Sequence, residues 1–179
     1  MEILLDIPQE VHASLQAHLL RDGSKLEEVA FLFAKSEREG DTLLFRYVDW
    51  FPVPPDGFEY HSSFCCELAD EIRASMIKRA HDLNASLVEF HSHTGPWPAQ
   101  FSLSDFEGFD EFVPHVWWRL KGRPYAAVVV TRTGFDALAW VENPESPRLL
   151  NGIRAGDKLL QPTGFSLQKG GLYHDDKIR

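Results

Sequence analysis

Apolar residues recur along the chain with two spacings, and the change from one to the other predicts the order of helices and strands. Residues 2–7 alternate loosely, as a short strand does. From Pro8 to Leu20 the apolar positions fall on one helical face, and proline suits the first turn of a helix. Residues 25–37 and 41–53 are rich in Phe, Val and Leu and flank a polar turn, which predicts a β-hairpin.

The middle of the chain predicts a loop, a helix and a strand. Residues 50–64 contain three prolines and a glycine, which favours an ordered loop or an edge segment over a central strand. Residues 65–84 have the clearest helical periodicity, and we expect Cys65 and Cys66 to be small buried residues at the start of that helix. Residues 85–93 then form an apolar strand.

A further helix is expected from about Asp105, followed by paired strands at residues 123–133 and 135–142. This order predicts an α+β domain, a mixed sheet flanked by helices. With 179 residues, 44% of them hydrophobic, the chain can bury one core and is short for two domains. We therefore assign residues 1–142 to the domain and 143–179, which are weakly patterned, to a C-terminal extension packed on it or trailing it.

The charge and hydropathy of the chain exclude some partners. A net charge of −9 and a pI near 5.3 speak against nucleic acid or an anionic membrane, because both bind basic surfaces. No window reaches the roughly 18 to 20 apolar residues that span a bilayer, and the N-terminus lacks the pattern of a signal peptide. We expect a cytoplasmic protein with a protein or small-molecule partner.

Two histidines at the end of the strand predicted at residues 85–93 suggest a metal site. His91 and His93 project to the same side of a strand, and Asp105 follows at the start of the next helix. Two imidazoles and a carboxylate are a ligand set for zinc, with one position left for water. A simpler interpretation competes with it, since Ser102 to Asp105 and Ser104 to Glu107 both match the capping-box pattern of a helix start.

A hydrolytic zinc site also needs a general base. Glu28 begins an otherwise apolar strand, where a carboxylate is costly to bury unless something charged faces it. Its neighbour Glu27 is the one serious rival, and we expect it to point to the opposite face.

Glu28 heading an apolar strand, then His91-Ser-His93, then Ser102-x-x-Asp105, resembles the signature of the JAMM or MPN+ metalloprotease family. The resemblance implies an MPN/JAB-like, cytidine-deaminase-like fold. It implies one zinc ion per chain on His91, His93 and Asp105, with Glu28 as general acid/base and Ser102 stabilising the oxyanion. The order of the motif favours this interpretation over a helix cap alone.

The chain departs from the family pattern in three places. Thr94 replaces a proline, Ala30-Phe31 replaces a Cys-Gly pair, and the loop before Ser102 is one residue longer. No ligand is lost by these changes. The longer loop leaves Ser104 as an alternative to Ser102.

The resemblance also implies a substrate. Members of the family cleave after the C-terminal glycine of ubiquitin-like proteins, and the compact prokaryotic members often act with activating and conjugating enzymes. We expect residues 50–64 to line the channel for an extended tail. The side chains predicted to contact it are Trp50, Phe51, Pro52, Phe58 and Trp97. The alternatives are a zinc peptidase acting on small peptides or a sulfur-carrier precursor, and a metal-free scaffold of the MPN type that acts by binding proteins.

Overall fold

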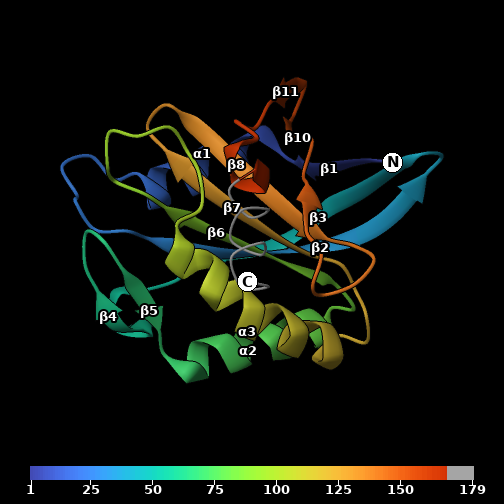
Figure 1. Ribbon diagram of the computed structural model, residues 1–179, viewed down its shortest axis with the longest axis horizontal. Helices are drawn as coiled ribbons and strands as arrows, with labels where there is room; N and C mark the ends of the chain where they lie inside the picture. Colours follow the sequence, from blue (N-terminus) through green and yellow to red (C-terminus); the bar gives the residue numbers. More distant parts are fainter. Residues whose placement is uncertain (169–179) are drawn as a thin grey trace, which may run out of the picture.

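A nine-stranded mixed sheet forms the centre of the computed structural model, which describes residues 1–168 (Figure 1). Its strands are β1 (Glu2–Ile7), β2 (Val29–Glu39), β3 (Thr42–Pro52), β6 (Ser86–Ser92), β7 (Tyr125–Thr131), β8 (Gly134–Trp140), β9 (Arg148–Leu149), β10 (Gly152–Ala155) and β11 (Lys158–Leu160). The spatial order is β11-β10-β1-β3-β2-β6-β7-β8-β9. Strand β1 runs parallel to β3 and β10, and β6 runs parallel to β7; the other pairs are antiparallel.

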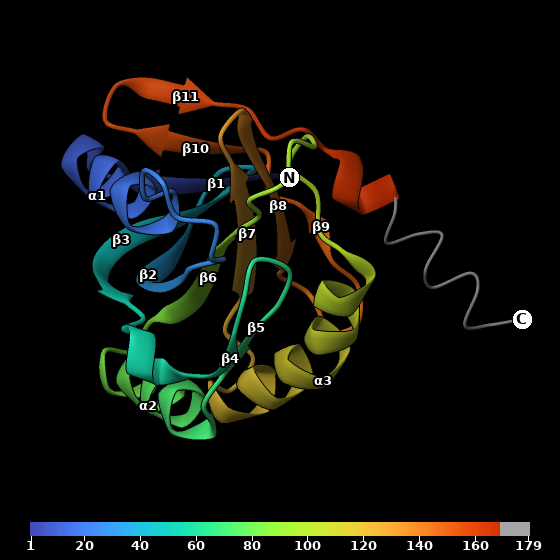
Figure 2. The same cartoon turned by 90° about the vertical axis from the view of Figure 1, so that its left-hand side faces the viewer.

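Helices cover both faces of this sheet. Helix α1 (Gln9–Leu19) lies on one face, whereas α2 (Asp70–Asp82) and α3 (Leu103–Arg119) lie together on the other (Figure 2). Helix α1 buries Val11, Leu15 and Leu19, the i, i+4, i+8 stripe that its sequence predicts. The predicted α+β architecture, a mixed sheet flanked by helices, is confirmed. Among residues 1–168, every helix falls short of the length and hydropathy needed to cross a bilayer.

Strand β2 separates the two cores because its side chains alternate between them. Phe31 and Phe33 pack toward α2 and α3, while Ala30, Leu32 and Ala34 pack toward α1. All five are fully buried. A residue's parity along β2 therefore decides which helices it faces.

The helix predicted at residues 65–84 begins later than its periodicity indicated. Residues Cys66–Leu68 form strand β5, which pairs with β4 (Phe58–His61) in a separate two-stranded hairpin after the short helix η1 (Pro55–Gly57). Cys65 is exposed and Cys66 is half-buried, so the expectation that both are buried at a helix start is wrong. The cause is tertiary, because pairing with β4 outweighs the local helical pattern.

The C-terminal extension supplies part of the main sheet. Strand β10 pairs in parallel with β1, on the far side of β1 from β3, and β11 and β9 add short edge pairings. Strands of two to four residues carry too little alternation to be recognised in sequence. The part of the predicted extension beyond residue 168 lies outside the described residues.

Candidate metal centre

Two imidazoles and a carboxylate meet where β6 ends and α3 begins. His91 and His93 project from the same side of the chain at the end of β6, and Asp105 comes from the first turn of α3. His91 Nε2 lies 3.2 Å from His93 Nε2 and 3.5 Å from Asp105 Oδ1. His93 Nε2 lies 3.3 Å from Asp105 Oδ2. The structure thus brings together all three ligands predicted from the sequence.

The spacing of these atoms suits a metal ion. Ligands about 2.0 to 2.1 Å from a tetrahedral ion lie about 3.3 Å from one another. The two imidazole nitrogens, 3.2 Å apart, are close to that edge length, and they face different oxygens of Asp105, with Oδ1 at 3.5 Å from His91 and Oδ2 at 3.3 Å from His93. One ligand atom from each of the three residues lies within 4.8 Å of the others, so the cluster could hold a metal ion.

The capping box predicted at Ser102 is also present, and it orients the ligand. The Ser102 backbone N–H and hydroxyl both donate to Asp105 Oδ2, at 2.6 and 2.7 Å. The Asp105 backbone N–H donates in return to Ser102 Oγ at 3.2 Å. One carboxylate oxygen is thus fixed by the helix start while Oδ1 faces His91. The helix cap and the candidate metal centre therefore share the same aspartate.

The electrostatics of the cluster favour a cation. Burial alone would raise the pKa of Asp105, but His91 and His93 hold that pKa well below its usual range. Burial also opposes the charged form of His91, yet Asp105, followed by Glu89 and Glu27, raises the pKa of His91 to about 9. His91 itself is only 4% exposed. Three carboxylates around a buried imidazole attract positive charge, whether a proton or a metal ion.

Glu27 faces this cluster, contrary to the expectation that it points away. It lines a pocket of about 570 Å³ together with His93 and Asp105. Burial raises the pKa of Glu27, and the nearby His93 and His91 act in the opposite direction. Glu27 therefore has the position and the protonation behaviour that were expected of Glu28.

Glu28 lies on the other face of the strand. Its backbone N–H donates to Ser92 Oγ at 2.9 Å, and its carboxylate lies 3.7 Å from His61 Nε2. The physical reason is register: Val29 is directly opposite His91, so the residue two before Val29 shares the face of the histidines and the residue one before does not.

The residues expected to contact a substrate divide into two groups. Trp50, Phe51 and Pro52 belong to β3 and pair with β2, and the side chain of Phe58 stacks on His61 with 4.0 Å between ring centres. Trp50, Phe51 and Phe58 also pack against the two cores. Trp97, by contrast, lines the pocket of Glu27 and is 71% exposed.

The same pocket is also lined by residues at the turn of the β4–β5 hairpin and at the start of α3. Phe64 is 92% exposed and lines it, as do Ser63, Cys65 and Cys66 at the turn of the β4–β5 hairpin. Ser104 lines it as well, with its hydroxyl 3.3 Å from Ser102 Oγ. Of residues 50–64, which were expected to line a substrate channel, the C-terminal end at Ser63 and Phe64 lines this pocket.

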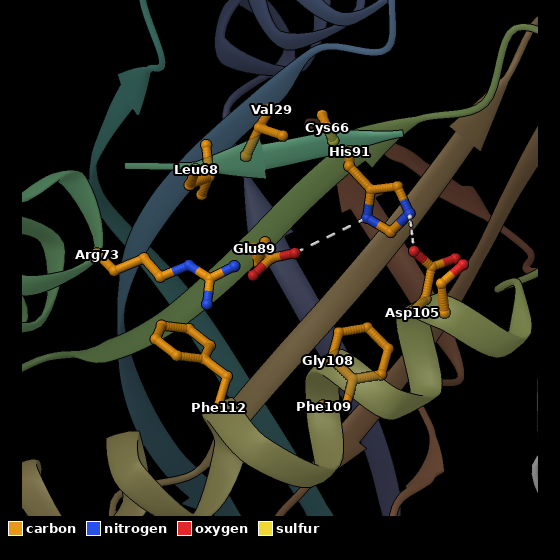
Figure 3. Close-up of a pocket in the computed structure, with 11 residues that line it drawn as sticks. Val29, Cys66, Leu68, Arg73, Glu89, His91, Asp105, Gly108, Phe109 and Phe112 are labelled. Atoms are coloured by element: carbon orange, nitrogen blue, oxygen red, sulfur yellow. Dashed lines mark ion pairs between the residues drawn. The ribbon is translucent and has the colours of Figure 1, made fainter. Parts of the chain in front are cut away.

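A second, smaller pocket of about 130 Å³ is lined by His91 and Asp105 (Figure 3). Glu89 and Arg73 project into it, and its walls include Phe109 and Phe112. Glu89 was not among the residues predicted from the sequence, although it is a charged residue in the middle of an otherwise apolar strand.

The C-terminal segment supports the loop that leads to Ser102. Buried Asp136 accepts from the backbone N–H groups of Gly164 and Ser166, at 2.9 and 2.7 Å. Ser166 Oγ then accepts from the Phe101 backbone N–H at 2.9 Å, and Thr163 Oγ1 donates to the carbonyl of residue 99 at 2.7 Å. The centre of the Phe101 ring lies 5.5 Å from that of the His91 ring. Residues 163–166 therefore hold in place a side chain that packs near His91.

Comparison with known proteins identifies no family. The sequence matches no family profile, and no curated protein matches it. Among solved structures, a solution structure of a protein from Salinibacter ruber (strain DSM 13855) is similar, with 17% sequence identity and a TM-score of 0.44. The match covers 90% of this chain and 96% of that one.

Proposed function

We propose that the protein is a zinc-dependent isopeptidase or peptidase of the JAMM type, with an MPN/JAB-like fold. Its substrate would be a bond after the C-terminal glycine of a ubiquitin-like modifier. The observation that carries the proposal is the cluster of His91, His93 and Asp105, two of which, His93 and Asp105, line one pocket together with Glu27. This constellation follows the order of the family signature along the chain.

The ligands and the acid/base would have separate tasks. His91, His93 and Asp105 would hold the zinc ion, which when bound polarises the scissile carbonyl and acidifies water at the site. Glu27 takes a proton from the attacking water and passes it to the leaving amine. Its raised pKa suits this exchange, because a carboxyl must accept and release a proton near neutral pH.

The hydroxyl groups of Ser102 and Ser104, at the start of α3, would have different roles. Ser102 already donates its hydroxyl hydrogen to Asp105, so its role is to orient that ligand. The Ser104 hydroxyl does not bond to Asp105 in the structure and lines the same pocket. We assign to Ser104 the hydrogen bond to the developing oxyanion, a contribution that in other hydrolases is worth about 10²–10³ in rate.

The shape of the pocket supports an extended, small-residue tail as the substrate. Phe64 and Trp97 stand exposed at the pocket, on segments that flank the cluster. Two such aromatic side chains can cover an extended chain whose glycines leave room for close approach. Modifier conjugates, together with their activating and conjugating enzymes, are the partners this function would require, and it would place the protein in the cytoplasm.

Hydrolysis of a defined probe tests the proposal. The zinc-loaded chain is incubated with a ubiquitin-like protein whose terminal Gly-Gly carries a fluorogenic amine. We expect chelator-sensitive release that falls about 10²- to 10⁴-fold in Glu27→Gln without loss of metal. Glu28→Gln serves as the matched control, since the same charge is removed from the opposite face. Bound zinc with no release from this probe or from short Gly-Gly peptides would contradict the proposal, and absence of bound zinc would favour the metal-free scaffold.

A further inference from the structure

Glu89 is a partly buried carboxylate to which the proposed chemistry assigns no task. It stands two residues before His91 on β6, so both side chains project from the same face. Its neighbours Val88 and Phe90 are almost fully buried, and its own side chain is 18% exposed. A carboxylate in such surroundings is costly unless hydrogen bonds or opposite charges compensate it. The groups around Glu89 therefore indicate why it is there.

Each oxygen of the Glu89 carboxylate has a neighbour. The hydroxyl of Tyr125, a fully buried residue of β7, donates to Oε2 at 2.9 Å. Oε1 lies 3.8 Å from His91 Nδ1, and Figure 3 shows the carboxylate between His91 and Arg73. The Arg73 guanidinium lies over the Phe112 ring, 5.3 Å from its centre, and lines the same pocket. Tyr125 thus fixes one oxygen, and the other faces the histidine.

Glu89 faces Nδ1 of His91, the ring nitrogen that is not turned toward the candidate metal centre. His91 Nε2 is turned toward His93 and Asp105. A neutral imidazole that gives Nε2 to a metal carries its proton on Nδ1, and that N–H needs an acceptor in a buried site. The present 3.8 Å is longer than a hydrogen bond. The pocket of about 130 Å³ that both residues line has room for a bridging water or for a small rotation.

We propose that Glu89 is a positioning residue that accepts the Nδ1–H of His91, directly or through one water. It holds the ring in the tautomer that presents Nε2 to the metal, while Tyr125 holds Glu89. This inference rests on the proposed metal centre and adds a supporting residue to it. A carboxylate behind a ligating histidine also makes the imidazole a stronger ligand.

Zinc titration of the metal-free full-length chain, against a chromophoric chelator, tests the inference without any substrate. We expect Glu89→Gln to bind zinc about 10- to 100-fold more weakly than wild type. Tyr125→Phe should weaken binding less, because Glu89 stays but loses its anchor. Glu67→Gln is the control: it removes the same charge from an exposed position on β5 and should leave the affinity unchanged.

A second readout separates positioning from general structural damage. In the zinc-loaded wild type, nitrogen NMR should show His91 protonated at Nδ1, with slow exchange of that proton. Protonation at Nε2 instead would overturn the inference even if Glu89→Gln failed to fold. Equal zinc affinities for wild type and a folded Glu89→Gln would overturn it while leaving the metal centre intact. A wild type that binds no zinc would overturn both.

Discussion

Glu27 and Glu28 are neighbours in the chain but face different chemistry. Alternation in the chain entering β2 predicts that they point to opposite faces. Glu27 lines the pocket of His93 and Asp105, whereas the Glu28 carboxylate lies 3.7 Å from His61 Nε2. Which of them faces the histidines depends on the pairing of Val29 with His91, a long-range register that periodicity does not contain. The sequence does contain one local clue. The glycine of the Cys-Gly pair in the JAMM signature, three residues after the glutamate, corresponds to Ala30 when counted from Glu27 and to the bulky Phe31 when counted from Glu28.

The three residues of the candidate metal centre were predictable because the features that place them are local. His91 and His93 share a strand face by spacing alone, and Asp105 is placed by a helix start whose pattern is visible in sequence. The supporting side chains were harder to find. Glu89 meets Tyr125 only because β6 and β7 lie side by side, and that pairing comes from the tertiary fold.

Proton release on metal binding is the prediction for His91. Its pKa is raised to about 9 in the metal-free protein, so at pH 7.5 the ring is protonated and zinc must displace that proton. Zinc affinity should therefore rise as the pH increases from about 6.5 to 9. The stabilisation that protonated His91 gives the metal-free fold is present below its unfolded pKa of about 6.5 and lost as the pH rises through 9.

Calorimetric titration of zinc in two buffers with different ionisation enthalpies measures this release. About one proton per chain should leave at pH 7.5. Identical apparent enthalpies in the two buffers would show that no proton moves, which would contradict a charged His91.

Among the helices and strands, the start of α3 has two roles: it caps the helix, and it orients the Asp105 side chain. The capping box satisfies backbone N–H groups of the helix and at the same time fixes Asp105 Oδ2. The predicted role of Asp105 at the helix start is thus confirmed, and it is compatible with the proposed role as a metal ligand. The helix itself extends to Arg119, with Pro114 inside it. Proline there removes one hydrogen bond, and the buried Val113 and Val116 pack the helix against the sheet despite it.

Ser102→Ala should weaken both the helix start and the metal site. We expect a loss of about 1 kcal/mol in the free energy of unfolding of the metal-free protein, as for other lost N-caps. Zinc affinity should also fall, because Asp105 loses one of the two donors that orient it. Urea denaturation and zinc titration measure the two effects. Ser104→Ala, which removes a neighbouring hydroxyl outside the cap, should leave stability nearly unchanged; equal losses in both variants would argue against the cap.

The hairpin of β4 and β5 marks the limit of prediction for elements. Residues 65–69 continue the helical periodicity of α2, yet β5 forms there because β4 lies alongside it. The consequence for function is direct. The turn of this hairpin, with exposed Phe64, stands beside the cluster, so the segment misread as helix supplies one wall of the pocket.

For the whole molecule, residues 143–168 belong to the main fold and support the site. Strand β10 extends the sheet beside β1, and residues 163–166 join Asp136 to the loop before Ser102. Short strands and a buried aspartate leave little trace in periodicity, which is why this region looked weakly patterned. The central architecture was predictable because its strands and helices are long and regular.

Asp136→Asn tests this support. An amide replaces one acceptor oxygen with a donor that faces backbone N–H groups, so a hydrogen bond to a charged group is lost. The expected cost is about 1.5 to 3 kcal/mol in the free energy of unfolding, measured by urea denaturation at neutral pH. Asp157→Asn, at an exposed turn, is the control and should change little. A similar small effect in both would show that Asp136 does not support the fold.

Metal content tests the central claim most directly. The untagged protein is supplied with zinc, freed of excess metal and measured by elemental analysis beside His91→Ala, Asp105→Ala and Glu27→Gln. We expect about one zinc per chain in wild type and in Glu27→Gln, and loss of zinc in the other two. Wild type without metal, or His91→Ala and Asp105→Ala with as much zinc as wild type, would contradict it.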